Sequence, residues 1–376
     1  MSQTQDGPIR VLNLFTIMDR GGAETMVMNY YRKIDRSKVQ FDFLVHRQQR
    51  GAYEDEIEAL GGRIYRMSPI YPQNFRKYKK ELRAFFQEHP EYRIIHAHMS
   101  ELGYFAFREA ARQGVPVRIC HAHNAPHGFD LKMIVRTYFK KRMMPYVTHL
   151  FMCGIESGRW LFGEENESRF IMLNNAIDAA AYSYDPRRRQ AVRQDLGLTG
   201  ELVVGHVGRF NKQKNHPFLI ELCAALLKRE PNAVLLLVGG GEDQPRIEQK
   251  VRDLGIAERV RFLGVRSDVA DLMQAMDVFA FPSLFEGLPV TMVEAQAAGL
   301  PCLISDGIPQ ECILTQGLVE IVPLAAGPEA WAERVLEKRN FPRTDRRAEI
   351  AAHGFDITTE AIKLQEFYQN AYEQTC

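Results

Sequence analysis

Two glutamates, Glu286 and Glu294, occur in a segment that can direct carboxylates at a ligand rich in hydroxyl groups. The apolar run before this segment predicts a strand, and Pro289 suits the first turn of a helix. Glu286 therefore falls in the connecting loop beside Gly287 and Leu288, whereas Glu294 falls on the helix about two turns further on. Each carboxylate can accept several hydrogen bonds, which suits the paired hydroxyl groups of a sugar. Two glutamates at this spacing are common by chance, but the frame of strand, loop, proline and helix favours a binding site.

Two cations follow the predicted strand Leu202–Val207, where Gly208 leads into Arg209 and, a little further on, Lys214. A guanidinium and an ammonium group that leave the same strand end can hold a pyrophosphate. Fixed cations stabilise the negative charge that develops on a departing nucleoside diphosphate. A solvated basic loop is the alternative interpretation of this motif taken alone.

Glycine runs follow two predicted strands. Gly21 and Gly22 stand between a strand and a helix, where the backbone can approach a ligand closely and the helix N-terminus can bind a diphosphate. A tight turn without a ligand is the alternative. The run Gly239–Gly241 indicates close approach of the backbone to a ligand or to a neighbouring strand. Neither run matches the fingerprint of dinucleotide-binding proteins or the P-loop.

Histidines gather at the ends of two predicted strands of one sheet, His96 with His98 and His121 with His123, and His127 follows. A single histidine is usually structural, but pairs at two carboxyl strand ends favour a functional role. A metal site is conceivable, yet no carboxylate joins the histidines in an obvious ligand set. Hydrogen bonding to a sugar or a phosphate is therefore the preferred interpretation, and no metal site is expected.

Short apolar runs alternate with amphipathic runs of helical period along the whole chain. Repeated β–α units predict α/β domains with parallel, doubly wound sheets, which bind ligands at the carboxyl ends of their strands. The predicted strands lie at residues 9–16, 41–46, 63–67, 93–98, 117–123, 149–153, 170–174, 202–207, 234–238, 260–263, 278–281, 302–305 and 320–322.

A polar segment at 178–198 marks a domain boundary. The expected units are an N-terminal Rossmann-like domain at 1–180, a C-terminal Rossmann-like domain at 181–355, and an amphipathic helix at 356–376. We expect this last helix to pack back toward the first domain. The crevice between two facing domains of this kind is a natural ligand site.

Composition favours a cytoplasmic protein that touches a membrane at most peripherally. The chain has 376 residues, a net charge of +1 and six cysteines without metal or disulfide spacing. The N-terminus lacks the pattern of a signal peptide, and no apolar run approaches the ~20 residues of a membrane span. The first 180 residues are basic overall and the rest acidic. The runs 76–80 and 136–144 mix cations with aromatic and apolar residues, which suits an anionic membrane surface or two solvated helix faces.

Five motifs, in this order along the chain, resemble those of the large retaining glycosyltransferase family 4, which has the GT-B fold of two Rossmann-like domains facing across a cleft. They are Gly21-Gly22-Ala23-Glu24, Asn175-Ala176-Ile177-Asp178, Gly208-Arg209 with Lys214, Gly239-Gly240-Gly241-Glu242, and Glu286 to Glu294 within the segment from Phe281. The segment 118–124 also resembles the subgroup that builds bacterial exopolysaccharide, capsule or O-antigen. The family usually has Gly where this chain has Ala176, so no catalytic role is assigned there.

The resemblance implies roles for the diphosphate of the donor. Gly21 and Gly22 would face the diphosphate, and Arg209 and Lys214 would hold its phosphates. The rest of the implied donor-binding set comprises Gly208, Gly287 and Leu288.

The resemblance also implies which residues contact the sugar nucleotide elsewhere. Glu294 would bind the ribose hydroxyl groups, and Glu286 would contact the donor sugar. A histidine after the fifth strand would lie beside that sugar; His123 fits this place best, and His121 is the other candidate. Glu286, His123, Arg209 and Lys214 form the expected catalytic set.

The implied activity is transfer of a hexosyl unit from a nucleoside-diphosphate sugar, UDP rather than GDP, to a glycan or lipid-linked sugar that docks on the N-terminal domain. Retention by front-face displacement fits best, because no second carboxylate for a covalent intermediate is evident. The family generally needs no metal or other cofactor, and no nucleic-acid partner is implied. The alternatives are a GT-B subunit without catalysis, a nucleotide-sugar epimerase, or a phosphorylase.

Overall fold

The computed structural model describes residues 7–123 and 132–375, so His127 lies outside the described residues. The chain forms two compact units. One comprises the residues up to Ala176 together with the segment from Ile357 onward, and the other is Ile177–Asp356. The chain therefore crosses between the units twice, a few residues before the predicted boundary at 180 and directly after the one at 355.

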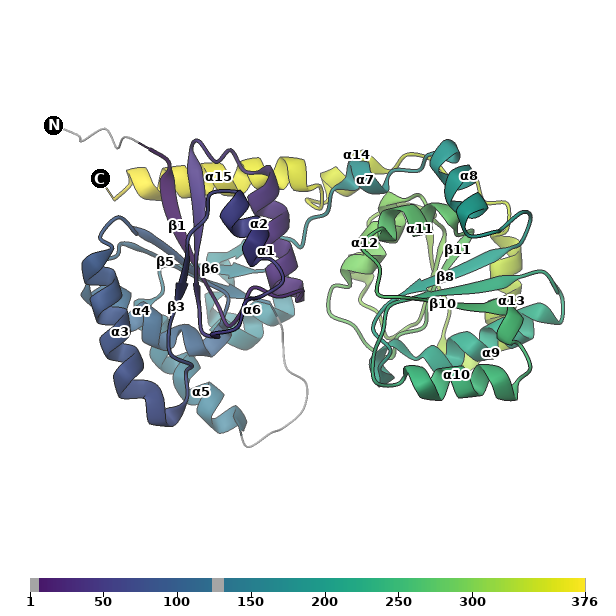
Figure 1. Cartoon of the computed structure of the whole chain (residues 1–376), viewed down its shortest axis with the longest axis horizontal. Coiled ribbons are helices and arrows are strands. Elements are labelled where there is room, and N and C mark those ends of the chain that lie inside the picture. Colours follow the sequence, from purple (N-terminus) through teal and green to yellow (C-terminus); the bar gives the residue numbers. More distant parts are fainter. Residues whose placement is uncertain (1–6, 124–131, 376) are drawn as a thin grey trace. The chain divides into compact units, whose positions relative to one another are not determined.

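The N-terminal unit contains a parallel sheet of order β3-β2-β1-β4-β5-β6-β7 (Figure 1). Its strands are β1 (Ile9–Phe15), β2 (Val39–Val45), β3 (Ile64–Arg66), β4 (Ile94–Ala97), β5 (Val117–Ala122), β6 (His149–Met152) and β7 (Phe170–Met172). Its helices are α1 (Gly22–Lys33), α2 (Glu54–Ala59), α3 (Phe75–Glu88), α4 (Tyr104–Arg112), α5 (Lys132–Met143), α6 (Ile155–Phe162) and α15 (Ile357–Glu373). The reversal of strand order occurs between β1 and β4, which is where doubly wound sheets bind ligands.

Helices cover both faces of this sheet, as the alternation of strand side chains requires. Leu12, Leu14 and Ile95 pack with α3–α6, whereas Val11, Phe15 and other intervening residues pack with α1, α2 and α15. Helix α15 runs beside α1 in this unit (Figure 1). Its buried side chains are Ile357, Glu360, Ala361, Leu364, Gln365, Tyr368 and Ala371. The last helix of the chain therefore completes the core of the first unit.

The second unit contains a parallel sheet of order β10-β9-β8-β11-β12-β13. Its strands are β8 (Val203–Val207), β9 (Val234–Val238), β10 (Val260–Gly264), β11 (Val278–Phe281), β12 (Cys302–Ile304) and β13 (Val319–Ile321). Its helices are α7 (Ala179–Tyr182), α8 (Pro186–Asp195), α9 (His216–Leu227), α10 (Gln244–Asp253), α11 (Val269–Ala275), α12 (Val290–Ala297), α13 (Gly327–Glu337) and α14 (Arg347–Ala352). The two predicted doubly wound sheets are thus confirmed.

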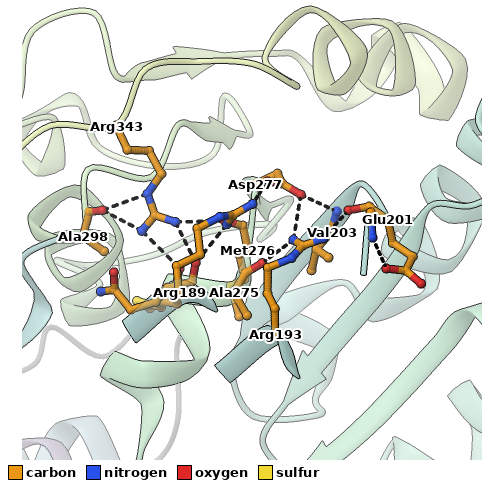
Figure 2. Close-up of polar contacts among 12 residues, drawn as sticks. Arg189, Arg193, Glu201, Val203, Ala275, Met276, Asp277, Ala298 and Arg343 are labelled. Carbon is orange, nitrogen blue, oxygen red and sulfur yellow. Dashed lines mark hydrogen bonds and ion pairs between the residues drawn. The ribbon is translucent and has the colours of Figure 1, made fainter. Parts of the chain in front are cut away.

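Arginines hold this second sheet together at the amino ends of its strands (Figure 2). Arg189 on α8 and Arg343 both donate to the backbone carbonyls of Gln274, in α11, and Met276, directly after it. Arg193 forms an ion pair with Asp277. The Asp277 carboxylate also accepts a 2.8 Å hydrogen bond from the Val203 amide at the start of β8. Burial lowers the pKa of Arg343 to about 9. The network holds β8 and β11 side by side, and these are the strands that carry the predicted cations and glutamates.

Two further expectations concern cysteines and membranes. The five cysteines that the structure describes are buried and free, and Cys376 lies outside the described residues. Among the helices in the described ranges, none combines the length and the apolar character needed to cross a membrane.

Candidate functional site

The second unit brings Lys214 and Glu286 together at the reversal of its strand order. Strands β8 and β11 are neighbours in the sheet although β9 and β10 lie between them in sequence. The loop after β8 carries Lys214 in the short 3-10 helix η5 (Lys212–Lys214), and the loop after β11 carries Glu286. Because the strands are parallel, both loops leave the same edge of the sheet.

Hydrogen bonds join these two loops before any ligand is considered. The Leu284 amide donates to the Gln213 carbonyl over 2.8 Å, and the Asn215 side chain donates to the Pro282 carbonyl over 3.1 Å. Asn215 has a φ of 53°, a left-handed conformation that asparagine tolerates better than most residues. The loops therefore form one rigid support for the charged side chains.

The Lys214 ammonium lies 2.7 Å from Oε1 of Glu286, and the Gln213 side-chain amide donates to Oε2 over 3.1 Å. The side chains of Lys214 and Glu286 are only 14% and 7% exposed, so their attraction is weakly screened by water. The ammonium also lies 4.5 Å from the centre of the Phe281 ring. A fixed cation beside a fixed carboxylate can hold a phosphate and a hydroxyl group of one ligand.

Arg209, the other predicted phosphate ligand, is exposed and makes no hydrogen bond or ion pair with another residue in the described ranges. Arg209 is the second residue after the end of β8, in the same loop as Lys214. Gly208 precedes it, and a side chain at that position would press against His206 and Lys214. The geometry thus orders Lys214 in advance and leaves Arg209 available to a ligand.

The glycines after β9 serve the packing of neighbouring loops. Gly239 and Gly241 have φ of +135° and +159°, and an added side chain at either would strike the backbone of Gly208 or Phe210. The Phe210 amide donates to the Gly240 carbonyl over 3.0 Å. Of the two interpretations of this run, close approach to a neighbouring segment is therefore the one that the structure explains.

Glu294 lies on α12 and is held by a residue that no sequence motif pointed to. The Tyr182 hydroxyl donates to Oε1 of Glu294 over 2.7 Å. Burial raises the pKa of the Glu294 carboxyl, and the bond from Tyr182 opposes that rise. Glu286 and Glu294 thus have separate partners, Lys214 and Tyr182.

The two remaining residues of the predicted donor-binding loop differ in exposure. Gly287 is exposed, whereas Leu288 packs against a small apolar cluster that includes Ile177 and Val293.

In the first unit, Gly21 and Gly22 mark the N-terminus of α1. Nothing lies close to the Cβ position of Gly22, whereas the Glu24 carboxylate occupies the space beside Gly21. Burial, together with the nearby Asp19, raises the pKa of Glu24. A carboxylate therefore already lies at the positive end of this helix, where the sequence predicted a diphosphate.

His96, His98, His121 and His123 form a single stack of rings on the face of the sheet covered by α1 and α15. Ring centres are 4.3 Å apart for His96 and His98, 4.2 Å for His121 and His123, and 5.2 Å for His96 and His121. The Tyr368 hydroxyl lies 2.7 Å from Nδ1 of His96. Burial lowers the pKa of all four histidines, that of His123 to about 4, so the stack is neutral at pH 7.

Nitrogens of His96, His98 and His121 lie within 4.8 Å of one another, close enough to raise the question of a metal ion. An ion bound to an imidazole nitrogen lies in the plane of that ring, at about 2.0–2.1 Å for zinc. The planes of His96 and His98 are tilted by 25°, those of His96 and His121 by 20°, and those of His98 and His121 by 44°. His96 therefore stacks on both of its neighbours, which is an arrangement typical of aromatic packing.

Comparison with known proteins bears on both units. A family model described as "Glycosyl transferase 4-like domain" matches residues 21–154, and one described as "Glycosyl transferases group 1" matches residues 188–337. The chain is 37% identical over 374 residues to the protein named "Putative glycosyltransferase EpsF" in Bacillus subtilis (strain 168), with 97% of each chain covered.

Two further similarities extend this result. An Escherichia coli protein named UDP-Gal:alpha-D-GlcNAc-diphosphoundecaprenol alpha-1,3-galactosyltransferase is 26% identical over 297 residues, covering 74% of this chain and 75% of that protein. The crystal structure of HepE from Anabaena in complex with UDP has a TM-score of 0.77 and 21% identity, covering 96% of this chain and 100% of HepE. This last similarity shows the fold alone.

The two family models and the 37% identity to EpsF together show the family. The chain belongs to the family 4 glycosyltransferases, and it is an enzyme with the GT-B fold.

Proposed function

We propose that this glycosyltransferase moves a hexosyl unit from a UDP-sugar onto a glycan or lipid-linked sugar in cell-surface polysaccharide biosynthesis, with retention of anomeric configuration. The observation that carries the proposal is the pair of Lys214 and Glu286, set 2.7 Å apart at the strand-order reversal of the second sheet. Lys214 and the exposed Arg209 would hold the diphosphate, and Glu286 would accept hydrogen bonds from the donor sugar.

The choice of UDP over GDP is supported by relatives. The E. coli relative is named for UDP-Gal and for an acceptor linked to diphosphoundecaprenol. HepE, which shares the fold, has been crystallised with UDP and with UDP-glucose. We assign the same donor class to this chain, and a lipid-linked sugar at the cytoplasmic face of the membrane is the acceptor that we expect.

Charge at the leaving group supports a reaction without a metal ion. A departing diphosphate gathers negative charge in the transition state, and a fixed ammonium and guanidinium stabilise that charge. In front-face displacement the leaving phosphate oxygen takes the proton of the acceptor hydroxyl, and the acceptor oxygen forms the new bond on the face that the diphosphate leaves. Full activity in the presence of a chelator, with an anomerically retained product seen by NMR, is the expected result.

Donor binding should depend on Glu294 and on the hydroxyl of Tyr182. Replacing Glu294 with glutamine removes a charged acceptor for ribose hydroxyl groups and should weaken UDP binding about 10- to 100-fold. Tyr182→Phe should weaken it less, about 5-fold, because the carboxylate remains but loses its 2.7 Å restraint. Calorimetric titration of UDP and GDP against each variant measures both effects, and slow hydrolysis of each nucleotide-sugar reports catalysis.

The surface variant Glu329→Gln, at a carboxylate that is 73% exposed, is the control and should bind UDP like the wild type. If neither UDP nor GDP sugars bound at millimolar concentration, the interpretation as a subunit without catalysis would replace the proposal. Conversion of the donor sugar without any acceptor would favour an epimerase instead.

Helix α5 is the surface that we assign to an anionic membrane. Ile134, Val135 and Tyr138 are 64%, 56% and 52% exposed, unusually high values for apolar side chains on one short helix. Lys141 and Arg142 are exposed on the next turn, and the Arg142 guanidinium lies 4.9 Å from the centre of the Tyr138 ring. Apolar side chains with cations beside them suit the boundary between lipid headgroups and acyl chains.

Vesicles with anionic phospholipid should bind the protein at low salt and release it at high salt. Replacing both Lys141 and Arg142 with glutamate should weaken vesicle binding about 10-fold or more, since each cation near an anionic surface contributes about 1 kcal/mol. Glutamate at Lys228 and Arg229, exposed cations of the second unit, is the matched control and should leave binding unchanged. Equal binding by all three proteins in a sedimentation assay would remove α5 from the proposal.

A further inference from the structure

We infer that Asn13 and His98 fix the tautomer of His123, so that Nδ1 of His123 presents a hydrogen-bond acceptor to the hydroxyl group of a ligand. The inference deepens the proposed function, because it rests on a sugar as the ligand beside His123. Asn13 and His98 are then positioning residues, and His123 has a donor at Nε2 and an acceptor at Nδ1.

The chain of hydrogen bonds begins at the buried amide of Asn13 on β1. The Asn13 Nδ2 atom donates to the Val11 carbonyl over 3.4 Å, which leaves Oδ1 facing Nε2 of His98, also at 3.4 Å. The reverse amide orientation would place two oxygens against each other at Val11. The Oδ1 atom of Asn13 can only accept a hydrogen bond, so Nε2 of His98 must carry the proton and donate to it.

The protonation of His98 also determines which nitrogen of His123 carries a proton. A neutral imidazole with a proton on Nε2 has a lone pair on Nδ1. Nδ1 of His98 lies 2.9 Å from Nε2 of His123, so the proton between them belongs to His123. His123 consequently carries its proton on Nε2 and a lone pair on Nδ1.

The surroundings of His98 and His123 keep both rings neutral and in place. Burial, with the neighbouring histidines, lowers the pKa of His98 well below its usual value, and burial lowers that of His123 to about 4. His98 stacks on Phe15 with ring centres 4.4 Å apart and planes tilted by 9°. The backbone of His98 donates to the Leu14 carbonyl of β1, and the His123 carbonyl accepts from the Cys153 thiol.

An acceptor at Nδ1 of His123 selects ligand groups by their polarity. A sugar hydroxyl can donate to it, whereas an ionised carboxylate or phosphate oxygen can only accept and would face a lone pair. A site with this polarity should therefore prefer a neutral hexose over the corresponding uronic acid as donor sugar. The stack thus contributes to specificity without an ionised group.

The tautomer can be measured directly in the free protein by long-range nitrogen–proton correlation NMR on histidine labelled with nitrogen-15. The expected spectrum at pH 7.5 shows His123 protonated at Nε2 only, with its signals assigned by their loss in His123→Gln. Asn13→Leu removes the acceptor and should give His123 a mixture of tautomers.

Kinetics provide a second measurement that a purely structural role would not reproduce. Asn13→Leu and His98→Phe should lower kcat/KM for the nucleotide-sugar about 10-fold, while the affinity for free UDP stays within about 2-fold, because UDP lacks the sugar. Phenylalanine at position 98 retains a ring that can stack on Phe15.

A His123 protonated on Nδ1, or a spectrum unchanged in Asn13→Leu, would overturn the inference. So would loss of UDP affinity that equals the loss of kcat/KM in both variants. If no nucleotide-sugar bound but the Nε2 tautomer were present and depended on Asn13, the proposed function would fail while the assigned tautomer stood. The two failures are therefore distinguishable.

Discussion

Replacing Lys214 with methionine is expected to lower the free energy of unfolding by about 3 kcal/mol and transferase activity at least about 100-fold. The stability loss arises because the Glu286 carboxylate, 7% exposed, loses the ammonium that lies 2.7 Å away. The activity loss arises because a fixed cation no longer opposes the charge on the leaving diphosphate. Urea unfolding and a donor-hydrolysis assay measure the two quantities separately.

The double variant Lys214→Met/Glu286→Gln separates structure from catalysis. Removing both charges leaves no uncompensated ion, so we expect most of the lost stability to return, to within about 1 kcal/mol of the wild type. Activity should remain at least about 100-fold low, because the groups that we propose to contact the donor are gone. Stability that recovers together with activity would show that the pair is only structural.

Lys212→Met is the matched control for Lys214. Lys212 belongs to the same 3-10 helix, is exposed, and forms no ion pair with another residue that the structure describes. Its replacement should change stability by less than about 0.5 kcal/mol and activity by no more than a few-fold. A control as inactive as Lys214→Met would contradict a specific role for the pair.

Lowering the pH from 7 to 5 should destabilise the protein strongly through its buried histidines. Burial holds the pKa of His46, His123 and His216 at about 4, and it lowers those of His96 and His121 as well. In the unfolded chain these groups titrate near 6.5. Between about pH 6.5 and 4 the unfolded chain therefore binds protons that the folded protein does not, and stability falls as pH falls.

The size of this effect is about 2 kcal/mol at pH 5 for each histidine that stays neutral in the fold. His121→Phe removes one such group and keeps a ring that can stack. The variant should lose less stability than the wild type between pH 7 and pH 5, by about 2 kcal/mol, as measured by urea unfolding at the two pH values. Equal losses in the two proteins would show that His121 takes up a proton in the folded state.

The sequence predicted the strands of both sheets to within two residues at most ends, because buried parallel strands are short apolar runs with clear ends. The polar segment 178–198 predicts a domain boundary, and the second unit begins at Ile177. Composition does not predict that Arg188, Arg189 and Arg193 of α8 in this segment bind to Asp271 of α11 and to Asp277. Its polarity reflects a network of ion pairs, which composition does not distinguish from a linker.

The predicted site residues come from sequence motifs and not from contacts in the fold. Spacing along the chain placed Glu286 and Lys214 at strand ends, but it gave no means of knowing that β8 and β11 are neighbours in the sheet. The pair spans 72 residues of sequence, and the bond between Tyr182 and Glu294 spans 112. Tyr182 follows three alanines and belongs to no recognisable pattern, so only the fold could connect it with Glu294.

The sequence by itself determined the alternation of strands and helices, the two units and the family, since each is recorded in consecutive residues or in a fixed order of short motifs. Tertiary structure alone decided which strand ends meet, that Lys214 faces Glu286, and that four histidines stack. It also placed Tyr368 of α15 against His96, 272 residues away. Such contacts depend on strand order and on the path of the chain between units, and these follow from the packing of whole apolar faces rather than from local periodicity.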